Sequence, residues 1–61
     1  MFTLSKNFIK VGEDLFLVLR TFREESVLNV DLVKQWLSAD AVYRRDGLYF
    51  FCEKIQDLEI L

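Results

Sequence analysis

The side chains that most often carry enzyme chemistry are few in this sequence and are poorly placed to act together. Cys52 is the only cysteine, and the chain has no histidine that could deprotonate it. A nucleophile needs such a base within hydrogen-bond reach, and the neighbouring Phe50, Phe51 and Ile55 predict burial, which raises the pKa of a thiol. Cys52 is therefore expected to be a structural thiol.

The acidic pairs Glu13-Asp14 and Glu24-Glu25 would serve acid–base catalysis only if both carboxylates of a pair faced one substrate atom. Adjacent side chains on a helix diverge by about 100°, so both pairs are expected to be solvated surface. A metal site would have to combine Cys52 with carboxylates, which is not a usual structural set. The two glycines stand at positions 12 and 47, too far apart for a phosphate-binding loop. The sequence predicts no enzyme activity, no metal or cofactor, and no small-molecule substrate.

Composition limits what can hold a chain of 61 residues together. At this length a domain buries only about 60% of its unfolded surface, and small domains usually add a disulfide, a metal or a partner chain. The single cysteine excludes an internal disulfide. A partner chain is the remaining source of stability, so we expect one small domain, residues 1–61, that forms a homo-oligomer.

Charge and hydropathy disfavour several classes of partner. Eight Lys and Arg residues face ten Asp and Glu residues, giving a formal net charge of −2. Dedicated nucleic-acid binders are more often basic, because phosphate contacts supply much of their affinity, so DNA is possible but disfavoured.

The longest apolar run, residues 15–19, is far shorter than the about 20 residues of a spanning helix, and the N-terminus lacks signal-peptide features. We expect a cytoplasmic protein without membrane contact.

Apolar residues near the N-terminus recur at helical spacing. Within residues 4–24 they form one stripe of an amphipathic helix: Leu4, Phe8, Val11, Leu15, Val18 and Phe22. For residues 8–22 the alternative is a β-hairpin with its turn at Val11-Gly12-Glu13-Asp14, because glycine inside a helix costs about 1 kcal/mol relative to alanine and the following residues also favour strands. We expect the long helix.

A second, shorter helix is predicted from Val30 to Ala39. Asn29 is a suitable N-cap, and Asp31 in the first turn complements the helix dipole. One face of this helix is expected to be buried, with Trp36 as a core anchor. That face carries Leu32, Val33, Trp36 and Leu37.

The segment YRRDGLYFF predicts a β-hairpin. Asp46-Gly47 between two apolar arms favours a type I′ turn, which requires positive φ at both central residues. With this turn, one face would carry Ala41, Tyr43, Arg45, Leu48, Phe50 and Cys52. The other would carry Val42, Arg44, Tyr49 and Phe51. Neither face is plainly polar, so we expect the second to be covered by another strand, by the tail or by another molecule. The tail from Glu53 fits either a short helix or a continuing strand.

The C-terminal half combines a helix, an arginine-bearing hairpin and a tail. Its parts are Val33-Lys34-Gln35-Trp36-Leu37, then Arg44-Arg45-Asp46-Gly47, then Tyr49-Phe50-Phe51, then Glu53 to Leu61. In this order they resemble the second helix, wing, return strand and closing helix of the winged helix-turn-helix domains of phage excisionases and MerR-type regulators. The resemblance implies DNA binding, with Lys34 and Gln35 facing the major groove and Arg44 and Arg45 holding phosphates.

Aromatic, aliphatic and arginine side chains together, as on the second hairpin face, are enriched at protein interfaces. We therefore expect partner binding through Val42, Arg44, Arg45, Tyr49 and Phe51.

The predicted fold is α+β, with a long amphipathic N-terminal helix, a short second helix and a C-terminal β-hairpin with a tail. The predicted function is that of a non-enzymatic adaptor or regulator acting by protein–protein contact as a homo-oligomer. The alternatives are a winged-helix DNA-binding regulator and a structural subunit of a larger assembly.

Overall fold

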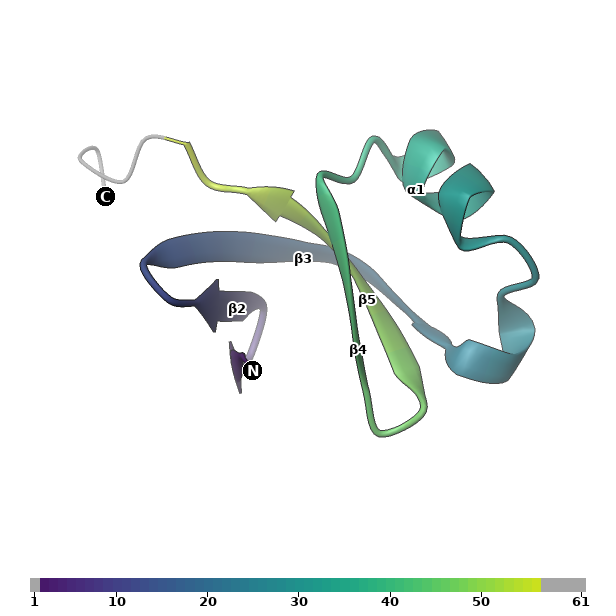
Figure 1. The fold of residues 1–61 in the computed structure, drawn as a ribbon, viewed down its shortest axis with the longest axis horizontal. Coiled ribbons are helices and arrows are strands. Elements are labelled where there is room, and N and C mark those ends of the chain that lie inside the picture. Colours follow the sequence, from purple (N-terminus) through teal and green to yellow (C-terminus); the bar gives the residue numbers. More distant parts are fainter. Residues whose placement is uncertain (1, 57–61) are drawn as a thin grey trace.

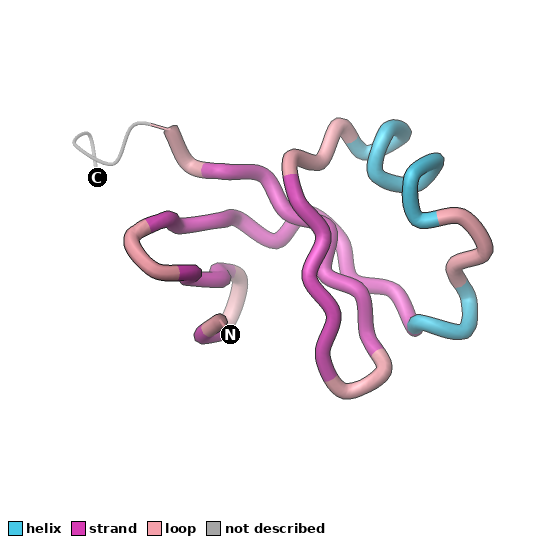
Figure 2. The backbone as a smooth tube through the Cα atoms, in the orientation of Figure 1, coloured by secondary structure: helices cyan, strands magenta, loops and turns pink. Residues whose placement is uncertain are grey.

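Residues 2–56, which the computed structural model describes, fold mainly as one antiparallel β-sheet with one α-helix beside it (Figure 1 and Figure 2). The elements, in chain order, are β1 (Thr3–Ser5), β2 (Phe8–Val11), β3 (Asp14–Arg23), the 3₁₀ turn η1 (Glu24–Ser26), α1 (Val30–Leu37), β4 (Ala41–Arg45) and β5 (Leu48–Lys54). The strand order is β1-β2-β3-β5-β4, and all neighbouring strands are antiparallel.

The predicted long N-terminal helix is wrong, and with it the predicted arrangement of two helices and a hairpin. Residues 8–22 lie in β2 and β3, which are joined by the two-residue turn Gly12-Glu13, as in the hairpin alternative. The stripe combines apolar residues from three strands, β1, β2 and β3, whose spacing happens to fit a helix. Only its last step, from Val18 to Phe22, crosses the register shift between Val18 and Arg20, where a bulge moves the later residues to the other face of the sheet.

Gly12 holds a left-handed backbone conformation, with φ of +60°, in the β2–β3 turn. An added Cβ would meet no atom within 4 Å, so only backbone strain opposes a substitution. This strain costs roughly 1–2 kcal/mol for most residues and less for asparagine. We expect Gly12→Val to lower the free energy of unfolding by about 1–2 kcal/mol in urea titrations, and Gly12→Asn to lower it clearly less. Equal losses would contradict an origin in backbone strain.

The C-terminal hairpin has the predicted turn and register. Asp46 and Gly47 have φ of +52° and +77°, and the cross-strand pairs run from Arg45↔Leu48 to Ala41↔Cys52. The order Asp-Gly specifies this turn locally, because few dipeptides tolerate two positive φ values in succession.

Within the described residues, the tail from Glu53 continues strand β5 in an extended conformation. β5 extends to Lys54, and the Ile55 N–H then donates to the Leu15 carbonyl oxygen at 2.9 Å. The start of the closing helix implied by the winged-helix resemblance is thus extended chain, and residues 57–61 of that helix lie outside the described residues.

One face of the sheet carries the main hydrophobic core. Its buried members are Ile9, Phe16, Phe50 and Cys52, with Phe2, Val11, Val18, Ala41, Tyr43 and Leu48 packed against them. On the opposite face of β5, Phe51 is completely buried. Its ring centroid lies 5.7 Å from that of Phe22 on β3 and 6.2 Å from that of Tyr49. β3 neighbours β5 in the same sheet, so Phe22 packs beside Phe51 on this face.

Phe2 brings the two edges of the sheet together. Its ring centroid lies 5.4 Å from that of Tyr43 on β4, and the Arg45 guanidinium lies 4.0 Å from the same Phe2 ring. Arg45 also donates a hydrogen bond to the Phe2 carbonyl oxygen. Because Phe2 precedes β1 at one edge and β4 forms the other edge, these contacts hold the sheet curled around its core.

Candidate interaction surface

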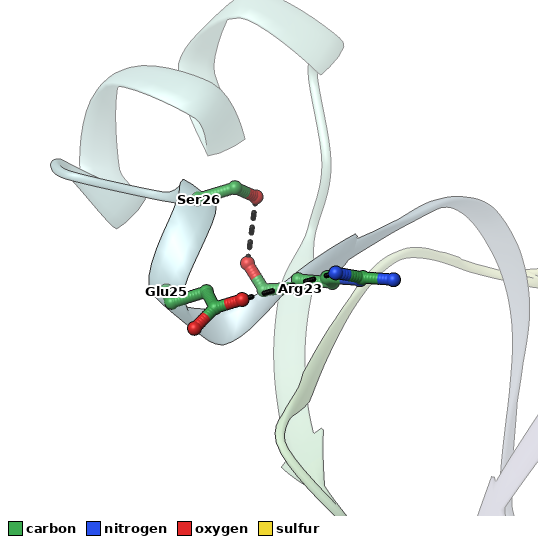
Figure 3. Close-up of polar contacts among 3 residues, drawn as sticks. All are labelled: Arg23, Glu25 and Ser26. Atoms are coloured by element: carbon green, nitrogen blue, oxygen red, sulfur yellow. Dashed lines mark hydrogen bonds and ion pairs between the residues drawn. The ribbon is translucent and has the colours of Figure 1, made fainter.

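The η1 turn fixes the start of the segment that carries α1. The Glu24 N–H donates to the Gly47 carbonyl oxygen at 2.7 Å, and the Glu24 carboxylate lies 3.1 Å from the Arg44 guanidinium. Within the turn, Ser26 Oγ donates to the Arg23 carbonyl oxygen at 2.7 Å (Figure 3). The turn is therefore bonded to the tip of the β4–β5 hairpin.

Asp40 fixes the end of the same segment. Its N–H donates to the Cys52 carbonyl oxygen at 2.8 Å, and its carboxylate accepts a hydrogen bond from the Lys54 N–H at 2.8 Å. The segment between β3 and β4 is thus attached to the β4–β5 hairpin before and after α1. The hydrogen bonds therefore hold the segment that contains the helix, and none of the helix's own residues is buried.

Local capping sets the limits of α1. Asn29 is the N-cap as predicted, since its Oδ1 accepts a hydrogen bond from the Leu32 N–H at 3.2 Å. The helix ends at Leu37, earlier than predicted, because Ser38 has φ of +56° and leaves the helical conformation. No helix in residues 2–56 is long and apolar enough to span a membrane.

α1 presents large apolar side chains to solvent. Val33 and Leu37 are half-buried, as part of the predicted buried face, but Leu32 is 61% exposed and Trp36 is 70% exposed. Trp36 is therefore not the core anchor that the sequence predicted. Leu28, just before the N-cap, is 99% exposed. Leu32 and Trp36 lie about one turn apart on α1, whereas Leu28 lies outside the helix; we call these three exposed residues the apolar stripe.

Leu28 has an available partner within the chain that it does not use. The residue before an N-cap often packs against the fourth helical residue as a hydrophobic staple, which here would pair Leu28 with Val33. The nearly complete exposure of Leu28 shows that this staple is not formed. The stripe is thus left without an apolar cover among the described residues.

The predicted partner-binding residues lie together on the β4–β5 hairpin, but contacts within the chain engage most of them. Phe51 has no exposed surface, and Val42 and Tyr49 are half-buried. Arg44 pairs with Glu24, and Arg45 packs on Phe2. Arg44 and Arg45 are consecutive strand residues, so they point to opposite faces of the sheet.

The residues predicted for DNA contact are divided between two elements. Lys34 is half-buried and Gln35 is exposed on α1, whereas Arg44 and Arg45 lie on β4. Strands β2 and β3 occupy the chain before α1, where the predicted first helix would stand. The winged-helix resemblance itself stays a prediction.

A surface hollow lies between η1 and the hairpin tip and offers no catalytic set. It is lined by Arg23, Glu24, Glu25, Asp46, Gly47, Leu48 and Tyr49. Glu24 is paired with Arg44 at 3.1 Å, and Glu25 lies 3.9 Å from Arg23 (Figure 3). The described part of the chain contains no cluster of three or more side chains suited to hold a metal ion.

Cys52 is a buried thiol. Its Sγ lies 3.4 Å from the Phe50 carbonyl oxygen, and burial raises the pKa of the thiol to about 11. Because the thiolate is the reactive form of cysteine, this side chain is suited to packing at neutral pH.

Comparison with known proteins gives no relative from which a function could be transferred. No protein-family model matches the chain, and searches of curated proteins and of solved structures find no match. The apolar stripe is the candidate interaction surface of this chain. One feature of the sequence indicates this surface: Leu28 lies four residues before Leu32 and outside the predicted helix.

Proposed function

We propose that this chain is a small non-enzymatic adaptor or regulator that acts by protein–protein contact through the apolar stripe of Leu28, Leu32 and Trp36. The observation that carries the proposal is the exposure of all three side chains on a segment attached to the sheet at both ends. Leu32 and Trp36 lie about one turn apart on α1. Exposed apolar patches mark interaction sites, and tryptophan is enriched among the residues that dominate binding energy.

The size of the stripe suits a contact of modest affinity. One tryptophan and two leucines at these exposures offer roughly 400 Å² of apolar surface. At about 25 cal/mol per Å², burying this area gains on the order of 10 kcal/mol, from which about 4–15 kcal/mol is lost in the entropy of association. Binding through the stripe is therefore expected to be reversible and to depend on further contacts at its rim.

The test compares the proteins retained from a cell lysate by the wild-type chain and by two variants. We expect a partner that Leu32→Ser/Trp36→Ser loses by about 30-fold or more, because interface hot spots contribute at least about 2 kcal/mol. Arg44→Ala should retain it, since an exposed ion pair contributes only about 0–1 kcal/mol. Circular dichroism must show that both variants remain folded.

Two outcomes of this comparison would contradict the proposal. A partner lost from Arg44→Ala but kept by Leu32→Ser/Trp36→Ser would place the contact on the β4–β5 hairpin. Retention of DNA that falls steeply with salt and requires Arg44 would favour the winged-helix alternative, because affinity built on phosphate contacts is salt-dependent.

A further inference from the structure

We infer that the open edge of strand β3 at residues 19–23 binds an extended acidic segment of another protein, which adds to the sheet as one more strand. The inference goes beyond the proposed function, because it assigns a second surface and does not depend on the apolar stripe. Strand pairing, exposure and charge at this edge each support it.

β3 has neighbours on both sides over only part of its length. On one side, β2 pairs with residues 14–17 (Figure 1), and the Val18 N–H donates to the Asn7 carbonyl oxygen at 2.9 Å. On the other side, β5 follows β3 as far as Arg23. Within the described part of the chain, no strand pairs with residues 19–23 on the side of β2. This stretch is the open edge.

The register shows which backbone groups the open edge offers. The Glu24 N–H donates to the Gly47 carbonyl oxygen at 2.7 Å, and two residues earlier Phe22 takes the same place in the ladder with β5. In an antiparallel ladder, hydrogen-bonded pairs alternate with pairs whose N–H and C=O groups turn the other way. The N–H and C=O of Thr21 and the N–H of Arg23 therefore turn to the open edge, where they can pair with an extended backbone.

The open edge is accessible to such a backbone. Arg20, Thr21 and Arg23 are exposed, so the described residues leave the strand uncovered on both of its faces. The edges at β1 and β4 are less suited, because β1 has only three residues and β4 lies against Phe2. Unpaired strand edges are templates for a strand of another chain, and strand addition is a recurrent mode of peptide binding.

Charge at the open edge favours an acidic partner. Arg20 and Arg23 lie on opposite faces of the strand, and Lys6 is exposed just before the point where β2 begins. The ion pairs among the described residues include neither Lys6 nor Arg20. Arg23 lies 3.9 Å from Glu25, but these side chains are 79% and 80% exposed (Figure 3), so the pair contributes little. Acidic side chains on either face of an added strand therefore meet an arginine.

The same charges disfavour a second copy of this chain at the open edge. Two β3 strands paired antiparallel about Thr21 would bring Arg20 and Arg23 of both chains into one short ladder. Like charges on neighbouring strands are destabilising, and charged side chains are a common means by which edge strands avoid pairing with their own kind. The open edge therefore favours a strand of opposite charge.

Amide hydrogen exchange tests whether the edge is open. In the free protein, the Thr21 N–H faces the open edge and the Phe22 N–H bonds β5. We expect the Thr21 amide to exchange roughly 10-fold faster than the Phe22 amide, or more. Equal protection of the two amides would overturn the inference, because the edge would then already be paired.

A peptide probe tests the chemistry of the partner. The probe is a capped hexapeptide of alternating glutamate and valine, and its control has lysine in place of each glutamate. We expect the glutamate peptide to bind with a dissociation constant of roughly 10 μM to 1 mM and to protect the Thr21 amide. The lysine peptide should bind at least about 10-fold more weakly, and Arg20→Glu/Arg23→Glu should reverse this preference. No binding of the glutamate peptide at about 1 mM, or equal binding of both peptides, would overturn an acidic partner.

Thr21→Pro separates strand addition from simple attraction of charge. Proline lacks the N–H that faces the open edge and is tolerated on strand edges, while both arginines remain. Thr21→Val keeps the N–H and the branched shape of the side chain. We expect Thr21→Pro to weaken binding of the glutamate peptide about 10-fold or more and Thr21→Val to bind it as the wild type does. Equal binding by the two variants would overturn strand addition.

Two further measurements keep the test decisive. If circular dichroism shows that Thr21→Pro does not fold, the wild-type Thr21 amide decides, since a bound glutamate peptide that leaves it unprotected is not an added strand. If this amide becomes protected with rising protein concentration and no peptide present, the occupant is a second copy and the acidic partner is overturned. Neither result bears on the apolar stripe, so the proposed function stands or fails separately.

Discussion

Phe51→Ala is expected to leave the protein largely unfolded at 25 °C. Phe51 has no exposed surface and packs against Phe22 and Tyr49 at ring-centroid distances of 5.7 and 6.2 Å. Truncating a buried phenylalanine to alanine costs about 3–5 kcal/mol. A domain below about 70–80 residues rarely has more than about 3–5 kcal/mol of stability. The expected loss is therefore comparable to the whole free energy of unfolding, which urea titration with circular dichroism measures for the wild type and the variant.

Phe8→Ala is the matched control for this prediction. It removes the same atoms from a side chain that is 38% exposed on β2, so we expect it to lower the free energy of unfolding by about 1–2 kcal/mol and to leave a cooperative transition. If both variants lose the same amount, Phe51 does not belong to the packed interior. The second hairpin face would then be open to a partner, as the sequence predicted.

The parts of the fold that the sequence predicted are those with local causes. The Asp46-Gly47 turn and the Asn29 N-cap each depend on the conformational preferences of one or two residues, and the structure confirms both. The strand register of the C-terminal hairpin follows directly from its turn. Such features do not depend on which distant segment packs against them.

The N-terminal half depends on pairing between distant segments. β3 is a strand because it pairs with β2 on one side and with β5, more than twenty positions away, on the other. Consecutive apolar residues in β2 and β3 leave no clear strand alternation, and their spacing also fits a helix. Nothing in the local sequence shows that β5 will be the partner, so the sequence pattern favours a helix where the structure has strands.

The candidate surface was missed for a related reason. α1 is apolar on more than one side, with Val33 and Leu37 in one direction and Leu32 and Trp36 in another. Hydrophobic periodicity indicates that a helix has an apolar face, but not which apolar side chains the rest of the chain will cover. The helical pattern predicts one buried face for these four residues. In the structure only Val33 and Leu37 are half-buried, and Leu32 and Trp36 are exposed.

Raising the pH from about 9 to about 11 is expected to destabilise the fold through Cys52. Burial raises the pKa of this thiol from 9.0 to about 11, so the folded state favours the neutral form. The contribution of the neutral thiol to the free energy of unfolding is fully present below its unfolded pKa of 9.0. This contribution is lost as the pH rises through the folded pKa of about 11. At about 1.4 kcal/mol per pKa unit, the loss amounts to about 2–3 kcal/mol. Urea titrations across this pH range will measure it.

Cys52→Ala separates the thiol from the other group that titrates in the same direction. The pKa of Tyr43 is also raised, chiefly by burial and further by negative charge on Cys52 and Asp14, so its ionisation adds to the alkaline loss. The variant should be about 1 kcal/mol less stable at neutral pH because a buried atom is removed, but its stability should fall less steeply above about pH 9. An unchanged alkaline slope would assign the whole effect to Tyr43. A flatter slope would show that the neutral thiol of Cys52 is part of what holds β5 in the core.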